Sequence, residues 1–521
     1  MLARRAAIWL VTLAVGALWT APAVAAVEPH PLFTDGAVLQ RDMSVPVWGT
    51  AKEGEKVTVK FNGQEKSTTA KEGRWQVVLD KMPAGGPFEL AISGDNQVAI
   101  KDVMVGEVWI ASGQSNMQWA VSQSAGAQEA IANAANPYIR LFTVPRQATP
   151  EPQSTVAAKW EPCNSQTLPA FSAVAYYFGR DVQKKLGVAV GLINTSYGGT
   201  PAEAWTSRAS LLASPTLKYM VEARDAAIAN HPAAKEQYAK ALAEWEKAAA
   251  KAKDAGEKAP NKPNPPADPS TSPHSPSGLY NAMIHPLLPF AFRGAIWYQG
   301  ESNAGRAWEY RTLFPAMISD WRQVWHKEDF PFLFVQLAPF MKITKEPGDS
   351  AWAELRDAQL FTTRALPNTA MAVITDVGEE NDIHPQKKQP VGERLALAAL
   401  ALAYGQSVEY SGPDASGVEL KGPQAVVKFK HLGGGLTAKD AQGNPTKELT
   451  GFTLAGDDKK FVNATAKIEG DTVVVSAPGV NKAAAVRYGW ANFPLGNLWN
   501  EAGLPASPFR TDDYPYTTAP K

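Results

Sequence analysis

Hydrophobic and polar residues alternate along the first part of the chain. Residues 56–61 (KVTVKF) and 74–79 (RWQVVL) place an apolar side chain at every second position, a pattern typical of strands that bury one face. Asn62-Gly63 directly follows the first of these runs and favours a hairpin turn. These features predict a small antiparallel β-sandwich over residues 27–106.

Apolar runs and helical periodicity alternate from residue 107 to residue 406. Residues 108–111 (VWIA) are apolar throughout, which indicates a buried strand. Residues 174–186 have helical spacing, and residues 188–195 again have the pattern of a strand. Because strands and helices alternate along the chain, this part predicts a parallel sheet covered by helices.

Two further changes of pattern indicate an insertion and a last domain. Residues 211–278 interrupt the alternation: 233–258 are rich in Ala, Lys and Glu, and 260–276 hold seven prolines, too many for a helix or strand. We interpret this insertion as an exposed helix and an extended segment, either a lid over a site or a solvated decoration without catalytic role. Beyond it, period-two runs such as 472–476 (TVVVS) predict a second β-domain over residues 407–521.

The first 26 residues have the composition of a cleavable secretory signal. Arg4 and Arg5 precede an apolar stretch at 6–19, and small residues at 23–26 follow, a combination that favours a signal peptide over a membrane span. Cys163 is the single cysteine, so no internal disulfide can form and the core alone must hold the fold. Together these features predict secretion through an inner membrane, into a bacterial periplasm, with no membrane association after cleavage.

Charge and composition narrow the classes of partner. Basic and acidic residues are equal in number, at 51 each, so the chain lacks the positive excess of a polyanion-binding protein. Nucleic acid is therefore not expected as a partner, and the sequence makes no prediction of the oligomeric state.

Candidate chemistry lies in turns that follow predicted strands. Ser115 leaves the strand at 108–111 on the turn Gly113-Gln114-Ser115-Asn116, at the edge where α/β sheets bind ligands. Its hydroxyl is expected to be exposed and its backbone N–H to be free of the strand ladder, as a nucleophile requires. An N-cap serine that only closes a strand-to-helix connection is the alternative.

A serine nucleophile needs a base, and His384 is the candidate. Of the seven histidines, it alone follows a predicted parallel strand and lies in a polar loop before a helix; the others are His30, His231, His274, His285, His326 and His431. Histidine suits the task because its pKa is close to neutral pH. Asp382 is the expected partner of its ring. A backbone carbonyl, which would leave a Ser-His dyad, and the carboxylates of Asp376, Glu379 and Glu380 are the alternatives.

Four blocks carry a resemblance to a known family. They are GQSN at 113–116, the Gly-Gly loop that ends at Gly199, WYQGESN at 297–303, and DIHP at 382–385. In this order they resemble the SGNH hydrolases, and in detail the sialate O-acetylesterase family. The resemblance implies an α/β, flavodoxin-like three-layer α/β/α core with β-sandwich-like domains at both ends. Most SGNH hydrolases have an aspartate three residues before the histidine, where this chain has Asn381.

The resemblance also implies an oxyanion hole and a substrate site. Backbone N–H groups of Ser115 and of Gly198 or Gly199 are expected donors, because glycine adds no side chain. The third donor of SGNH enzymes is a side-chain amide, here expected from Gln299, with Asn303 as the alternative. Candidate substrate contacts are Gln114, Asn116, Glu301, Asn303 and Trp205. Glu301 could also support its loop, and Trp205 and Trp308 are the aromatic residues expected nearest a pocket.

The leading hypothesis is a carbohydrate O-acetylesterase similar to sialate O-acetylesterases. Ser115 would attack an acetyl ester on a sugar hydroxyl, His384 would move the proton, and water would release acetate, with no metal or cofactor. An esterase acting on acetylxylan or another polysaccharide is one alternative. A glycosidase using Glu301 would need a second carboxylate and would leave Ser115 and His384 without a role. A carbohydrate-binding protein on a hydrolase scaffold is the non-enzymatic alternative.

Overall fold

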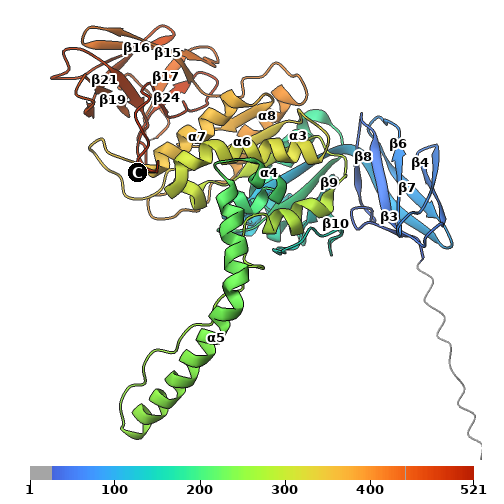
Figure 1. Ribbon diagram of the computed structural model, residues 1–521. Coiled ribbons are helices and arrows are strands. Elements are labelled where there is room, and N and C mark those ends of the chain that lie inside the picture. Colours follow the sequence, from blue (N-terminus) through green and yellow to red (C-terminus); the bar gives the residue numbers. More distant parts are fainter. Residues whose placement is uncertain (1–25, 441, 521) are drawn as a thin grey trace, which may run out of the picture.

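The computed structural model describes residues 26–440 and 442–520 (Figure 1). The predicted signal peptide, residues 1–26, lies outside the described residues except for Ala26. Within the described part, no helix combines the length and apolar character that a bilayer crossing needs.

The N-terminal region is an all-β body beside the core (Figure 1). Its predicted strands at 56–61 and 74–79 are confirmed, and both alternate buried and exposed positions. Strand pairs are antiparallel here, except that β2 runs parallel to β8. The strands are β1 (Glu28–Pro29), β2 (Val38–Gln40), β3 (Val45–Thr50), β4 (Lys56–Phe61), β5 (Gln64–Thr69), β6 (Arg74–Leu79) and β7 (Gly85–Ser93).

One long strand, β8 (Gln97–Gly113), joins this region to the core. Its first part pairs antiparallel with β7, and its second part pairs parallel with β11 and β12. The strand therefore runs through residue 107, where the α/β pattern of the sequence begins. Residues of the second part are buried on both faces, which explains why 108–111 are apolar throughout.

The core is a mixed α/β structure built on a large sheet. Its strand order is β10-β9-β11-β8-β12-β13-β14, with all pairs parallel except β10 with β9. The strands are β9 (Asn136–Thr143), β10 (Trp160–Cys163), β11 (Val190–Ser196), β12 (Gly294–Tyr298), β13 (Phe332–Val335) and β14 (Thr369–Ala372). The carboxyl ends of β8, β11 and β12 therefore meet at one edge.

Helices bury both faces of this sheet (Figure 1). On one face α3 (Ala173–Leu186) packs against α8 (Gln389–Leu402), and the apolar cluster there includes Trp109. On the other face α6 (Ala307–Val324) packs against α7 (Ala351–Ala365), with Ile110 in the cluster. Because neighbouring residues of a strand point to opposite faces, Trp109 and Ile110 anchor the two helical layers. Short helices are α1 (Ser115–Gln118), α2 (Ala127–Ala132) and α4 (Arg208–Ala213).

The insertion forms an arm that leads away from the body (Figure 1). Helix α5 (Lys218–Asp254) is 37 residues long and begins well before residue 233, where the composition indicated a helix. Of its residues only Met220, Val221 and Ala252 are buried. The proline-rich segment 260–276 has no helix or strand, as its composition predicts. It returns along the helix, to which the bond from the Trp245 indole N–H to the Pro260 carbonyl (2.8 Å) ties it.

The C-terminal region is a second all-β body. The predicted strand at 472–476 is confirmed as β22 and pairs antiparallel with β16 and β21. Three small sheets make up this region. Their strands are β15 (Asp414–Lys421), β16 (Gln424–Lys430), β17 (Leu436–Lys439), β18 (Pro445–Thr446), β19 (Phe452–Ala455), β20 (Phe461–Asn463), β21 (Thr465–Glu469), β22 (Thr472–Ser476), β23 (Ala485–Tyr488), β24 (Leu498–Asn500) and β25 (Phe509–Arg510).

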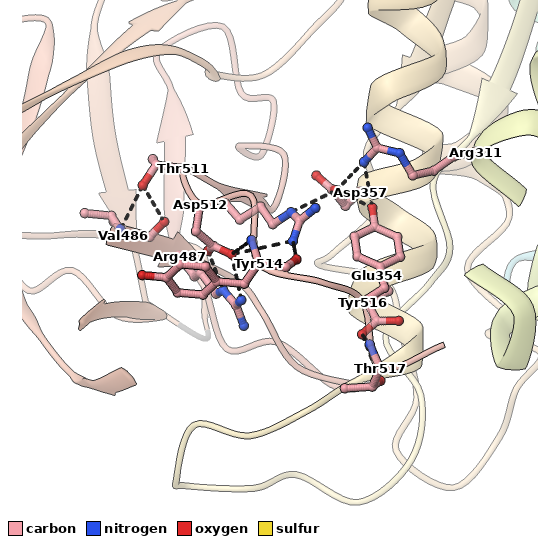
Figure 2. A network of polar contacts seen from close by, with 11 residues as sticks. Arg311, Glu354, Asp357, Val486, Arg487, Thr511, Asp512, Tyr514, Tyr516 and Thr517 are labelled. Carbon is pink, nitrogen blue, oxygen red and sulfur yellow. Dashed lines mark hydrogen bonds and ion pairs between the residues drawn. The ribbon is translucent and has the colours of Figure 1, made fainter. Parts of the chain in front are cut away.

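The chain after β25 returns to the core helices, and Figure 2 shows the polar contacts that fix it. Glu354 of α7 accepts hydrogen bonds from the backbone N–H and hydroxyl of Thr517 (2.6 and 2.8 Å). Asp357, one turn further along α7, accepts from the Tyr516 hydroxyl and pairs with Arg311 of α6 (3.2 Å). The tail therefore ties the C-terminal body to both helices of one core face.

Candidate active site

Ser115 lies directly beyond the end of β8, where glycine is required. Gly113 has φ +133°, and a Cβ there would lie 2.2 Å from the Tyr298 carbonyl oxygen of β12. The next residue, Gln114, donates its backbone N–H to the same oxygen (2.9 Å). This close approach fixes the turn that starts α1 at Ser115. The Ser115 backbone N–H is in the first helical turn, so it has no acceptor within the helix.

The structure brings the two predicted catalytic side chains together. The Ser115 Oγ and His384 Nε2 atoms are 2.8 Å apart, although the residues are 269 positions apart in the chain. His384 lies in the loop between β14 and α8, and its side chain is 29% exposed. Its ring stacks on Trp119 at 5.2 Å between centroids and 18° between planes. Both residues are therefore partly exposed, and the His384 ring is held in a defined orientation.

Asp382 binds the backbone of His384 more closely than its ring. The Oδ1 atom accepts the His384 backbone N–H at 2.8 Å, whereas it lies 3.5 Å from Nδ1. The second distance exceeds that of a normal N–H···O bond. Burial lowers the pKa of His384, and the nearby Asp382 carboxylate opposes that shift. The lowered pKa favours the neutral ring that a base requires.

The three alternative carboxylates in this loop have other partners. Asp376 forms a two-point pair with Arg394 (2.6 and 2.7 Å). Glu379 accepts the backbone N–H of Gln386, and Glu380 accepts that of Ile343. Each carboxylate shapes the loop rather than contacting the imidazole.

The glycine turn after β11 lies beside Ser115. A Cβ placed on Gly198 would be 3.3 Å from the Ser115 Cβ. The Gly198 N–H donates to Oε1 of Gln118 at 2.7 Å. Gly199 is exposed, has φ +75° and has open space around its Cα. The Gln118 side chain thus already accepts a hydrogen bond from one of the two glycine N–H groups that the sequence indicated as donors. Nothing in the sequence indicated this role for Gln118.

The side-chain amide expected in the oxyanion hole is bonded to other parts of the protein. Gln299 is fully buried, and its two amide hydrogens go to the Thr200 carbonyl (3.2 Å) and to Oδ1 of Asn303 (2.6 Å). Asn303, the alternative, is also buried and donates to Glu203 (3.0 Å). Through these bonds both amides hold the loop after β12 against the glycine loop. Their hydrogens are already bonded inside the protein.

Two further predicted substrate contacts have buried side chains. Trp205 has no exposed surface; its indole N–H donates to the Thr200 hydroxyl (3.0 Å), and its ring packs edge-on against Trp297. Gln114 is 3% exposed, and its Oε1 accepts the backbone N–H groups of Gly300 (3.4 Å) and Ser302 (3.3 Å). These residues belong to the scaffold of the turns.

Asn116, also a predicted substrate contact, follows Ser115 and is fully buried. Its Nδ2 donates to Glu301 Oε1 (2.6 Å) and to the Ile383 carbonyl (3.0 Å), and its Oδ1 accepts from Lys388 Nζ. Both ends of the predicted substrate contact Asn116 are therefore bonded within the protein. Glu301 supports the turn, which is the second role that the sequence left open for it.

Burial shifts the titration of both charged groups in this cluster. It raises the pKa of the Glu301 carboxyl and lowers the pKa of Lys388 to about 7. The sequence analysis overlooked Lys388, although a lysine directly before a helix is unusual because the helix dipole disfavours positive charge there. Among the described residues, no group of three or more His, Cys, Asp or Glu side chains is arranged to hold a metal ion.

Comparisons with known proteins define the class of this chain. Residues 272–401 match the family model described as "Carbohydrate esterase, sialic acid-specific acetylesterase". The crystal structure of a carbohydrate acetylesterase from Xanthomonas citri is 37% identical, with a TM-score of 0.79 over 94% of this chain and 100% of that one. The chain is therefore an esterase of the carbohydrate esterase class.

Curated relatives define the family within that class. The sialate O-acetylesterase of Homo sapiens is 34% identical over 423 residues, which cover 74% of this chain and 72% of the human protein. That of Mus musculus is 31% identical over 517 residues, covering 91% and 92%. The chain belongs to the sialate O-acetylesterase family, which confirms the resemblance seen in its motifs.

Proposed function

We propose that this chain hydrolyses acetyl esters on the hydroxyl groups of sialic acids or related sugars, with Ser115 as nucleophile and His384 as general base. The observation that carries the proposal is the 2.8 Å contact between Ser115 Oγ and His384 Nε2 at the carboxyl edge of the parallel strands. A hydroxyl in hydrogen-bond contact with a neutral imidazole is the arrangement that activates serine.

The proposed reaction has two steps, and both use this contact. His384 Nε2 removes the Ser115 proton as Oγ attacks the acetyl carbonyl, and the same proton passes to the departing sugar oxygen. Water, deprotonated by His384, then attacks the acetyl-serine; acetate leaves and the proton returns to Ser115 Oγ.

The oxyanion of each tetrahedral intermediate needs donors close to Ser115. The Ser115 N–H and the N–H of Gly198 or Gly199 are the proposed set, because both turns flank the hydroxyl. Gln118 Oε1 occupies the Gly198 N–H, so it has to move aside where Gly198 and not Gly199 is the donor. We assign no side-chain amide to this hole.

Asp382 is proposed to position the base. Its bond to the His384 backbone N–H holds the loop in a tight turn. Its carboxylate is also the acidic group closest to Nδ1, at 3.5 Å, where it stabilises the ring when it becomes charged during the reaction.

The finer description of the fold and location belongs to the same proposal. The core is interpreted as an SGNH-type three-layer α/β/α domain, 107–406, between β-sandwich-like domains at 27–106 and 407–521. The first 26 residues are proposed to be a signal peptide that exports the enzyme to the periplasm. The support is the strand order of the sheet and the composition of the leader.

Acetate release tests the proposal directly. Wild type and Ser115→Ala are compared on O-acetylated sialic acid and on acetylated xylan, with the fold of the variant checked by circular dichroism. We expect wild-type turnover and a loss of about 10³-fold or more in the variant. Activity that survives in Ser115→Ala would exclude the serine mechanism, and preference for xylan would assign the enzyme to polysaccharide deacetylation instead of sialate deacetylation.

A further inference from the structure

Asn116 connects three parts of the chain that surround the proposed nucleophile. It follows Ser115 in α1, it donates to Glu301 in the loop after β12, and it donates to the carbonyl of Ile383, the residue before His384. Its remaining polar atom, Oδ1, accepts from Lys388 Nζ. One buried amide therefore links the nucleophile turn to the turn that carries the base.

Lys388 is enclosed by the same elements. It has no exposed surface, and its ammonium lies 5.5 Å from the centroids of both the Trp119 and Tyr298 rings. Trp119 is also the ring on which His384 stacks. Cation–π contacts of a desolvated ammonium stabilise the geometry of the rings as well as the charge. Lys388 thus contacts the Trp119 face and, through Asn116, the His384 turn.

We propose that Lys388 is a positioning residue for ester hydrolysis: it holds Asn116 and Trp119 in place, so that the Ile383–His384 turn stays against Ser115, and its positive charge disfavours protonation of the His384 ring. The inference rests on the proposed roles of Ser115 and His384. Asn116 can bridge Ile383 and Glu301 with its two amide hydrogens only while its oxygen has a donor, and Lys388 is that donor.

The charges around the pair decide the direction of the electrostatic effect. Asp382 faces His384 from the same loop and favours the protonated ring, whereas Lys388 disfavours it. Glu301, Asp382 and Glu379 face Lys388 and favour its charged form. In its charged form, which these carboxylates favour, Lys388 opposes protonation of the His384 ring. Removing this charge raises the pKa of His384.

The pH profile of Lys388→Met tests the inference. On para-nitrophenyl acetate we expect kcat to fall about tenfold with little change in KM, because alignment and not ester binding is lost. The acidic limb of kcat/KM is expected to move to higher pH by roughly half a unit or more, since a neighbouring positive charge no longer opposes protonation of His384. Lys387→Met is the matched control, because it removes the same charge from an exposed neighbour of Lys388. Its kcat and the acidic limb of its kcat/KM profile should match those of wild type.

Folding and the proposed mechanism are tested separately. If Lys388→Met is unstable because Glu301 is left without a counter-charge, Lys388→Met/Glu301→Gln removes both charges and retains an acceptor for Asn116. The acidic limb of kcat/KM should also lie at higher pH than in wild type in the double variant. A folded variant with wild-type kcat and an unshifted limb would overturn the inference. If Ser115→Ala kept full activity, the proposed function would fail instead, so the two failures are distinguishable.

Discussion

The Ser115 turn and the α5 arm differ in what their polar side chains contact. Behind Ser115, the amides of Gln114 and Asn116 are buried and bonded to turns from other strands. On the arm, the ion pair of Lys240 with Glu236 (2.8 Å) is between side chains that are 73% and 69% exposed. Exposed pairs contribute about 0–1 kcal/mol, whereas an unpaired buried polar group costs about 1–3 kcal/mol. The polar side chains are therefore held in fixed positions at the Ser115 turn and only weakly on the α5 arm.

At the Ser115 turn, the substitution His384→Ala is expected to have the largest effect on activity. We expect kcat on para-nitrophenyl acetate to fall about 10³-fold or more, because among the described residues His384 is the base in hydrogen-bond contact with Ser115 Oγ. Steady-state kinetics at neutral pH measure the loss, and an unchanged thermal midpoint shows that the fold is intact. A loss of less than tenfold would mean that the 2.8 Å contact is not used in the reaction.

Two substitutions of Asp382 separate its hydrogen bond to the His384 backbone from the effect of its charge. Asp382→Ala removes the acceptor of the His384 backbone N–H, and we expect kcat to fall about tenfold. Asp382→Asn keeps an acceptor oxygen for the backbone N–H and should lose only about threefold, because a carboxylate 3.5 Å from Nδ1 stabilises the charged ring weakly. An Asn variant as impaired as the Ala variant would show that the charge on the ring matters more than the turn.

Gln118→Ala changes a contact of the nucleophile turn that we expect to be dispensable. The substitution frees the Gly198 N–H, so an oxyanion no longer displaces a protein acceptor, and kcat/KM should rise about threefold, the equivalent of one weak hydrogen bond. Progress curves at low ester concentration give this ratio directly. A decrease in kcat/KM would show that Gln118 itself contributes to substrate or transition-state binding.

Removing the arm should have the smallest effect. Arg224 and Ser275 are in contact at its base (3.0 Å), so residues 227–272 can be replaced by a short Gly-Ser linker without separating the ends. We expect kcat/KM on para-nitrophenyl acetate within about twofold of wild type, since surface segments of this kind tolerate change. The same measurement on acetylated xylan and O-acetylated sialic acid is the sharper comparison: a loss confined to these substrates would favour the lid that the sequence left open.

The sequence predicted what depends on local pattern. Period-two runs located β4, β6 and β22, and the small-residue turn after an apolar run located Ser115. His384 followed from its place after a strand, because the carboxyl ends of parallel strands converge. The sequence did not predict which side chains after the strands are buried. Gln299 and Trp205 follow strands as Ser115 does, but nothing in their neighbours indicates that their side chains point inward.

Lys388 shows the same limit of prediction from sequence, because its burial was not expected. A lysine in a polar loop is normally solvated, and only the enclosing rings of Trp119 and Tyr298 show that this one is buried. Those rings come from the C-terminus of α1 and the last residue of β12, so the environment exists only once the sheet has formed. Tertiary contacts of this kind leave no periodic signal in a single sequence.

The continuity of β8 also bears on how such a protein could have arisen and how it could be recombined. Glu107, in the middle of that strand, is fully buried and pairs with Arg41 on the N-terminal side and Arg293 (2.9 Å) on the core side. A graft that exchanged the N-terminal body for another module at this point would cut a strand and leave a buried charge without one of its partners. The two bodies are therefore expected to be inherited as a unit, and chimaeras between relatives should join outside β8.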